Sequence, residues 1–112
     1  GPNLILEMLA NVNLAADLDV VAKYGRIIVI GNRGEITINP RLTMMKELDV
    51  RGMAIFNASD DQVTYLVSDL TAGLTDGSLK PVIGRELPLA EAAESHRAVM
   101  QPGAHGKIVL LP

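Results

Sequence analysis

The sequence contains no cysteine and no tryptophan, and aromatic residues make up only 3% of its 112 residues. Without thiols the chain has no disulfide framework and offers no thiolate ligands for a structural zinc ion. A chain free of cysteine is typical of the reducing cytoplasm, which we expect as its location. The scarcity of aromatic rings also leaves few platforms on which the bases of single-stranded RNA can stack.

An excess of positive charge and a long apolar run are missing as well. The chain has 10 Lys and Arg residues against 13 Asp and Glu residues, which gives a formal net charge of −3. It therefore lacks the basic surface of nucleic-acid-binding domains, and RNA is not supported as a partner of these residues. No apolar segment reaches the roughly 18 residues that a transmembrane helix needs, so we expect no membrane partner.

Aliphatic side chains dominate what is present. Hydrophobic residues make up 48% of the chain, and most of them are Leu, Ile, Val, Ala and Met. This composition is typical of a parallel sheet covered by helices, and the length suits a domain of ordinary size. An α/β fold is therefore the first expectation.

The first thirty residues have the pattern of a βαβ unit. The runs Leu4–Met8 and Arg26–Ile30 predict strands, and the second has no polar alternation, so we expect both of its faces to be covered. A helix over residues 14–23 would supply the crossover that parallel strands require. A ligand of such a sheet lies outside the carboxyl ends of its strands, which here are residues 8–13 and 31–34.

The predicted crossover helix has an apolar stripe and recognisable ends. Three apolar residues recur at spacings of four and three and predict its buried face: Leu14, Leu18 and Val21. Asp17 is expected in solvent. Asn11 or Asn13 would cap the free amides at its start, and Gly25 would end it.

The middle of the chain continues the alternation of extended and helical patterns. Residues 36–38 alternate as an extended piece, and Asn39-Pro40 then opens a short helix that ends near Leu48. The segment Val50–Phe56 predicts a third strand. Gly52 lies inside it and would permit a close approach of another backbone.

The second half of the sequence predicts one long helix and a strand–helix–strand unit. The capping box Ser59-x-x-Gln62 opens the helix, and Gly77 follows its end. Its apolar face consists of Val63, Leu66, Val67, Leu70 and Leu74. An extended segment, a helix and a final strand follow over residues 81–111.

Four stretches carry a resemblance to a known family: EMLANVNL (residues 7–14), GRIIVIGNRGEITINP (25–40), KPVIGRELPL (80–89) and GKIVLL (106–111). In this order and at these separations they resemble the C-terminal third of zeta-crystallin-type NADPH:quinone oxidoreductases, zinc-free members of the medium-chain dehydrogenase/reductase superfamily. The resemblance covers essentially the whole chain. It implies that the chain is a fragment of a longer enzyme.

The resemblance also implies a fold in two parts. Residues 1–79 would be the second half of an NADP-binding Rossmann-type domain, a parallel sheet with flanking helices. Residues 80–112 would be a strand–helix–strand segment that returns to the catalytic domain. The G-x-x-G at residues 31–34 follows the wrong strand to be the pyrophosphate loop of such a domain.

The implied activity is the transfer of reducing equivalents from NADPH to a quinone. The cofactor is the reactive group and the protein positions it. No zinc is expected. The tyrosine and the phosphate-binding residues of the complete enzyme have no counterpart in the chain, so we expect the isolated chain to be inactive. The alternative class is a non-catalytic module, either a structural crystallin or the RNA binding attributed to some zeta-crystallins as full-length proteins.

The resemblance places the cofactor at the carboxyl ends of the strands. Asn13 would hydrogen-bond the ribose region of NADPH. The segment after the second strand and the third strand would line the nicotinamide side, through Ile30, Gly31, Asn32 and Arg33 and through Met53, Ala54 and Ile55.

Several of these residues also have simpler interpretations. Asn13 is equally suited to capping a helix, and Gly31 and Gly34 to a turn with positive φ. Arg33 is attractive as a ligand for the 2′-phosphate of NADPH, but that group is bound after an earlier strand in this fold, so we expect Arg33 on the nicotinamide side or in solvent. His96 is expected to be a hydrogen-bonded core residue.

The strand over residues 50–56 has a second predicted role. In the family it commonly joins two subunits by continuing the sheet across a two-fold axis. We therefore expect a homo-oligomer through this edge, while the strand at residues 4–8 would form the other free edge.

Overall fold

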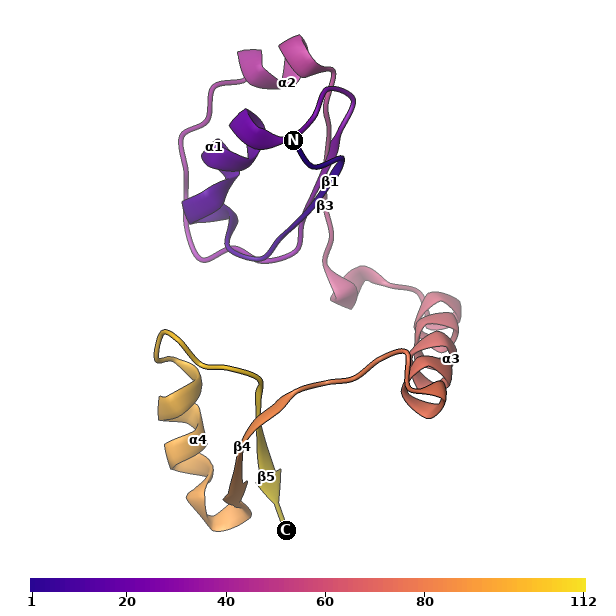
Figure 1. Ribbon diagram of the computed structural model, residues 1–112, viewed down its shortest axis with the longest axis vertical. Helices are drawn as coiled ribbons and strands as arrows, with labels where there is room; N and C mark the ends of the chain where they lie inside the picture. Colours follow the sequence, from indigo (N-terminus) through magenta and orange to yellow (C-terminus); the bar gives the residue numbers. More distant parts are fainter. The chain divides into compact units, whose positions relative to one another are not determined.

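In the computed structural model, which describes residues 1–112, the chain forms two compact units. The first is Gly1–Ala58 and the second is Ser59–Pro112 (Figure 1). Both consist of parallel strands and helices. The predicted α/β class is therefore confirmed.

The first unit is built around a parallel sheet in the order β1-β2-β3. Its strands are β1 (Leu4–Glu7), β2 (Arg26–Val29) and β3 (Asp49–Gly52), joined by the helices α1 (Ala10–Val20) and α2 (Arg41–Lys46). In this register Ile5 pairs with Ile27, and Ile27 pairs with Val50. The predicted βαβ unit is confirmed, and β1 and β3 are the two edges of the sheet.

The core of the first unit lies on one face of this sheet. Leu18, Val21 and Ile27 are fully buried there, and the residues packed against them are Ile5, Leu14, Val29, Leu42 and Leu48. On the opposite face Leu4 and Leu6 are 54% and 61% exposed. On that face of β2 Arg26 is exposed and Ile28 is half-buried, so the expectation that both faces of this strand are covered is met only in part. Right-handed crossovers between strands that advance in one direction place both helices on the same face.

Helix α1 begins a full turn before its predicted start and ends earlier than predicted. Its N-cap is Leu9, so Asn11 and Asn13 lie inside the helix, and neither caps it. Gly25 is not the C-cap either, because the chain already leaves the helix at Val21, with φ −60° and ψ 142°.

A lysine from α2 satisfies the C-terminal end of α1. The Lys46 ammonium donates hydrogen bonds to the carbonyl oxygens of Leu18, Asp19 and Val21, at 2.9, 2.6 and 3.0 Å. The last carbonyls of a helix have no partner within it, and a cation is favoured there by the helix dipole. Lys46 thus fastens α2 to the end of α1.

The segments on either side of α2 follow the predictions only in part. The N-cap of α2 is Pro40, so the predicted cap at Asn39 with proline inside the helix is wrong by one residue. The Asn39 side chain still accepts a hydrogen bond from Arg41 N–H at 3.1 Å, and residues 36–38 form no strand. Strand β3 ends at Gly52, and residues Ile55–Asn57 form a short 3-10 helix, η1. No atom lies within 4 Å of a Cβ built at Gly52, so the predicted close approach does not occur within the chain.

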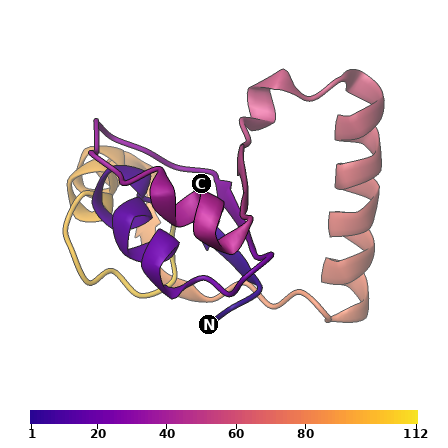
Figure 2. The same ribbon diagram turned by 90° about the horizontal axis from the view of Figure 1, so that it is seen from above.

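The second unit opens with the long helix α3 (Asp60–Asp76), which Figure 2 shows as one straight element. The Ser59–Gln62 capping box is present with both of its hydrogen bonds, and Gly77 ends the helix with φ 79°. Both ends were predicted correctly. The predicted apolar face is half exposed, with values from 41% at Leu66 to 55% at Leu74.

The rest of the second unit is a strand–helix–strand motif, as predicted. Its elements are β4 (Ile83–Pro88), the 3-10 helix η2 (Leu89–Glu91), α4 (Ala92–Val99) and β5 (Lys107–Leu111), and the two strands are parallel. His96 is exposed on α4, so it is not the core residue that was expected. None of the helices of the chain combines the length and apolar character needed to cross a membrane. The predicted division at residues 79 and 80 lies inside this unit and stays a prediction about a complete enzyme.

Candidate functional site

The carboxyl ends of the three strands of the first unit meet at one edge of the sheet. Ile30 N–H donates to the Glu7 carbonyl at 2.8 Å, and Met53 N–H donates to the Val29 carbonyl at 2.9 Å. The start of α1 joins them, because Ala10 N–H donates to the Gly31 carbonyl at 3.0 Å. The structure therefore places the residues expected to bind a cofactor along one continuous edge, although they come from three separate parts of the sequence.

Position 31 requires glycine because another part of the backbone lies very close to it. A Cβ at this position would lie 2.1 Å from the Met8 carbonyl oxygen, so any side chain would force β1 and β2 apart. Neither Gly31 nor Gly34 has a positive φ. The interpretation of these glycines as residues of a positive-φ turn is therefore wrong.

The loop at residues 31–34, which follows β2, is held by two asparagine side chains. Asn11 of α1 accepts a hydrogen bond from Arg33 N–H at 2.9 Å, and the Asn32 amide donates to the Gly34 carbonyl at 2.7 Å. The Arg33 side chain is exposed and takes part in none of the ion pairs of the chain. The backbone of the loop is thus fixed, while the Arg33 guanidinium is free for a ligand.

Asn13 lies in the second turn of α1 and is exposed. Its Nδ2 donates to Oε1 of Glu7 at 3.3 Å. A carboxylate only accepts hydrogen bonds, so this contact fixes which end of the Asn13 amide faces the strand.

Glu7 is buried at the end of β1 and is the centre of a polar cluster that the sequence analysis missed. Its carboxylate accepts the N–H of Leu9, the N-cap of α1, and the Asp17 carboxyl lies beside it. The Leu9 N–H is the first of the contacts that hold the pKa of Glu7 below its ordinary value. Glu7 therefore does at the start of α1 what Asn11 or Asn13 was expected to do.

Asp17 is half-buried, contrary to the expectation that it faces solvent. Burial raises its pKa to about 6, with the neighbouring Glu7 carboxylate contributing to the rise. Its Oδ2 is buried without a hydrogen-bond partner. The signal for this placement was in the sequence, because Asp17 follows Leu14 by three residues and so lies beside the apolar stripe.

The residues predicted on the third strand lie just beyond it. Met53 still bonds to β2, but Ala54 is the N-cap of η1 and Ile55 is its first residue. Met53 and Ile55 are 45% and 52% exposed. They add apolar surface to an edge that otherwise presents amide groups and one guanidinium.

The donor set of this edge suits binding better than catalysis. The chain has no group of three or more His, Cys, Asp or Glu side chains arranged to hold a metal ion. The Glu7–Asp17 pair is the only carboxyl cluster among the residues named above, and it is engaged in holding α1. The arrangement can orient a flat ligand with polar substituents between apolar side chains and backbone groups.

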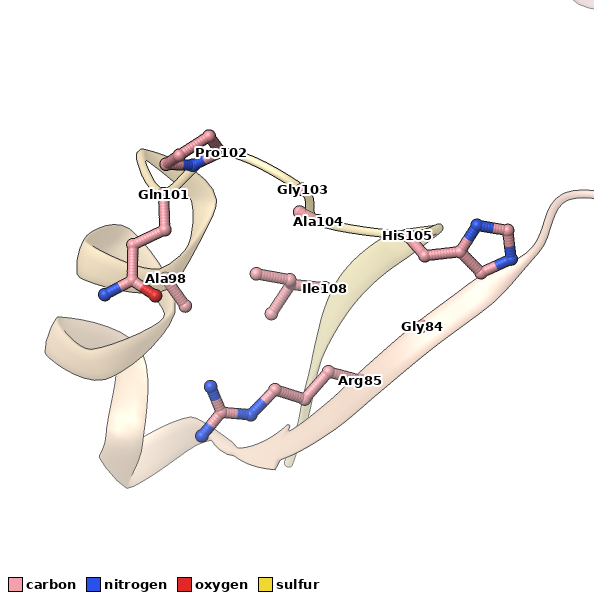
Figure 3. Close-up of a pocket in the computed structure, with 9 residues that line it drawn as sticks. All are labelled: Gly84, Arg85, Ala98, Gln101, Pro102, Gly103, Ala104, His105 and Ile108. Carbon is pink, nitrogen blue, oxygen red and sulfur yellow. The ribbon is translucent and has the colours of Figure 1, made fainter.

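A separate cavity of about 270 Å³ lies in the second unit (Figure 3). It is lined by Gly84, Arg85, Ala98, Gln101, Pro102, Gly103, Ala104, His105 and Ile108. Arg85 is paired with Glu94 at 3.6 Å. None of the predicted site residues lines this cavity.

Comparison with known proteins places the chain among dehydrogenases. The sequence model of the family described as zinc-binding dehydrogenase matches residues 1–110. The quinone oxidoreductase of Homo sapiens is 46% identical over 112 residues, which are 99% of this chain and 34% of that protein. The quinone oxidoreductase of Sus scrofa is 44% identical over the same shares. The chain thus spans about a third of the length of these curated relatives.

Solved structures agree with this placement. The quinone oxidoreductase from Thermus thermophilus, described also in complex with NADPH, is 30% identical with a TM-score of 0.84, over 100% of this chain and 37% of that one. A structure described as an NAD-dependent alcohol dehydrogenase is 28% identical with a TM-score of 0.82, over 100% of this chain and 32% of that one. The sequence match over nearly the whole chain and the shared fold lead to one conclusion: this chain belongs to the zinc-binding dehydrogenase family.

Proposed function

We propose that this chain is the C-terminal part of a zeta-crystallin-type quinone reductase that transfers reducing equivalents from NADPH to a quinone. Support comes from the relatives described as quinone oxidoreductases and from the Thermus thermophilus enzyme, which is described in complex with NADPH. The observation in the chain itself that carries the proposal is the convergence of Asn13, the loop at residues 31–34 and Met53–Ile55 at one sheet edge. Ligands of parallel sheets bind at this edge.

The residues of the edge fit the nicotinamide half of the cofactor. When bound, NADPH supplies the hydride, and the protein orients it. The exposed side chains of Met53 and Ile55 offer apolar contact to a flat ring, and Ile30 and Gly31 bring backbone groups to its polar substituents. Ala54 and Asn32 complete the lining, Arg33 lies on the nicotinamide side, and Asn13 serves the ribose region.

Zinc has no assigned role in this proposal. The family description includes zinc binding, but the chain has no cysteine and none of its acidic and histidine side chains form a metal-binding group. Any zinc ligands would have to come from outside these residues. The alternative role as an RNA-binding module has no support in the net charge of −3.

A charge placed on the nicotinamide side tests the proposal in the full-length protein. Ile55→Asp should lower kcat/KM for NADPH-dependent quinone reduction by more than about tenfold, because a carboxylate would be desolvated against the ring. Met44→Asp is the matched control. Met44 is 74% exposed on α2, whose last residue contacts the opposite end of α1, and its change should leave kcat/KM within about twofold.

The isolated chain provides a second test. It holds half of the expected cofactor contacts, while the cost of immobilising a ligand is several kcal/mol whatever the number of contacts. We expect NADPH affinity in the millimolar range at best and no quinone reduction by the 112 residues alone. Micromolar NADPH binding to this chain in a calorimeter, or equal effects of Ile55→Asp and Met44→Asp, would contradict the assignment.

A further inference from the structure

The buried Glu7 carboxylate links the sheet, the start of α1 and one of the proposed cofactor ligands. Oε1 accepts both the Leu9 N–H and the Asn13 side-chain amide, the latter at 3.3 Å. The Asp17 carboxyl, one turn further along α1, lies beside the same carboxylate. Among the proposed cofactor contacts only Asn13 bonds to the Glu7 carboxylate, whereas Ile30 and Gly31 donate to the Glu7 backbone carbonyl.

The contact decides how Asn13 faces a ligand. One hydrogen of its Nδ2 is donated to Glu7, which turns Nδ2 toward the carboxylate and Oδ1 away from it. A carbonyl oxygen accepts hydrogen bonds and repels an anion. A ligand group that meets Oδ1 must therefore be a donor, such as a ribose hydroxyl, and a phosphate oxygen is disfavoured at this atom.

We propose that Glu7 is a positioning residue, which holds the Asn13 amide with Oδ1 outward and so selects a hydroxyl donor of the bound dinucleotide. This inference rests on the proposed function, because it assigns the Asn13 partner within that cofactor site. Glu7 itself does not touch the ligand. It acts through the orientation of Asn13 and through the Leu9 N–H at the start of α1.

Other charged groups near the cluster have their own partners or lie elsewhere. Lys46, the charged group that α2 sends to α1, is engaged with three carbonyl oxygens at the far end of that helix. The neighbouring positions of β2, Ile27 and Val29, are apolar. Asp17 is thus the one ionisable side chain that lies against the Glu7 carboxylate.

A double-mutant cycle in the full-length protein tests the coupling. Glu7→Gln removes the charge and leaves one amide oxygen to serve both Leu9 N–H and Asn13, so the KM for NADPH should rise by about tenfold with kcat changed by less than about threefold. Asn13→Ala should give a similar rise. The double variant should be no worse than the poorer single variant, because both changes remove the same ligand contact.

The controls separate positioning from stability. Glu47→Gln removes an exposed carboxylate of the same unit, which pairs with Lys23 at 3.7 Å, and should leave the KM for NADPH unchanged. Glu7→Asp keeps the charge but shortens the side chain by one methylene group. Its effect on the KM for NADPH should therefore be smaller than that of Glu7→Gln, with the same coupling to Asn13→Ala. If Glu7→Gln does not fold, the Glu7→Asp variant provides the test in its place.

A spectroscopic measurement separates this inference from the proposed function. With asparagine labelled with nitrogen-15, the side-chain NH₂ signals of Asn13 should move in Glu7→Gln and stay in place in Glu47→Gln, whether or not NADPH binds. Unmoved Asn13 signals in Glu7→Gln, or kinetic effects of Glu7→Gln and Asn13→Ala that multiply, would overturn the positioning role. Absence of NADPH binding by the unaltered protein would overturn the proposed function and leave the NMR result to decide about Glu7.

Discussion

Glu7 and Asp17 are two carboxyl groups in contact whose pKa values move in opposite directions. Hydrogen bonds, first from Leu9 N–H, lower the pKa of Glu7, so its contribution to stability is present above its ordinary value of 4.5 and is lost as the pH falls. Burial raises the pKa of Asp17 from 3.8 to about 6, so the folded state holds that proton more tightly and loses stability as the pH rises through this range. On these two groups alone, the free energy of unfolding should rise with pH up to about 4.5 and fall again as the pH approaches about 6.

Replacement of Asp17 by asparagine tests this pH dependence. Asp17→Asn should raise the free energy of unfolding by about 1–2 kcal/mol at pH 7.5, a figure reduced from the full shift because the side chain is only half-buried. At pH 4 the change should be close to zero, since Asp17 is protonated there. Urea unfolding at the two pH values measures it, and an equal effect at both would show that the carboxyl proton is not involved.

Arg33 is the exposed cation of the proposed site, and the structure holds its backbone but not its guanidinium. Arg33→Ala should therefore change the KM for NADPH in the full-length protein by less than about tenfold, or ~1.4 kcal/mol. The comparison with NADH is the control. A selective loss of NADPH over NADH would mean that Arg33 binds the 2′-phosphate, contrary to its expected place on the nicotinamide side.

At the scale of elements, the ends of α1 show what the sequence can and cannot predict. The capping box of α3 was predicted correctly because both of its partners, Ser59 and Gln62, lie within one turn of sequence. The start of α1 depends instead on Glu7 from the preceding strand, and its end on Lys46 from another helix. Such contacts between elements leave no local pattern.

The candidate site was predictable to a similar degree. The resemblance named Asn13, the segment 30–33 and residues 53–55, and the strand pattern placed them at one edge. The roles of Asn11 and Glu7 were not predicted. Asn11 contacts the Arg33 backbone only after α1 has packed against the sheet. Glu7 lies in a run of apolar residues, and the partners of its carboxylate cannot be identified from the sequence around it.

Lys46 is expected to stabilise α1 more than its place on a short helix suggests. Lys46→Met removes three hydrogen bonds from a charged donor and should lower the free energy of unfolding by about 2 kcal/mol. Lys23→Met is the matched control, because that ammonium forms an exposed ion pair, and its change should stay within about 0.5 kcal/mol. Equal losses in the two variants would show that the carbonyl contacts contribute little.

At the scale of the whole molecule, both edges of the first sheet are unpaired within the chain. Asp49 and Met53 donate their N–H groups to Gly25 and Val29, so by the alternation of a strand the N–H groups of Val50 and Gly52 point to the open side of β3. A second copy can pair with this edge around a two-fold axis, which is the basis of the predicted homo-oligomer. The strand available for it is Asp49–Gly52, shorter than the predicted 50–56.

A proline on the open side of β3 tests this association. The chain should be dimeric by light scattering at about 100 μM, and Gly52→Pro should weaken the dimer because it removes a donor from the edge without touching the bonds to β2. Gly52→Ala is the control, since a Cβ there meets no atom within 4 Å. A strictly monomeric chain, or a dimer that tolerates the proline, would rule out this interface.

The three carbonyl oxygens around the Lys46 ammonium also affect its chemistry. An acylating reagent must reach the amine nitrogen, and at Lys46 that nitrogen faces three carbonyl oxygens at the end of α1 while the side chain is half-buried. Lys23, Lys80 and Lys107 are exposed and lack such a cage. Lys46 should consequently be the last lysine of the chain to be acetylated by a small reagent, and its protection would disappear as soon as α1 and α2 separate.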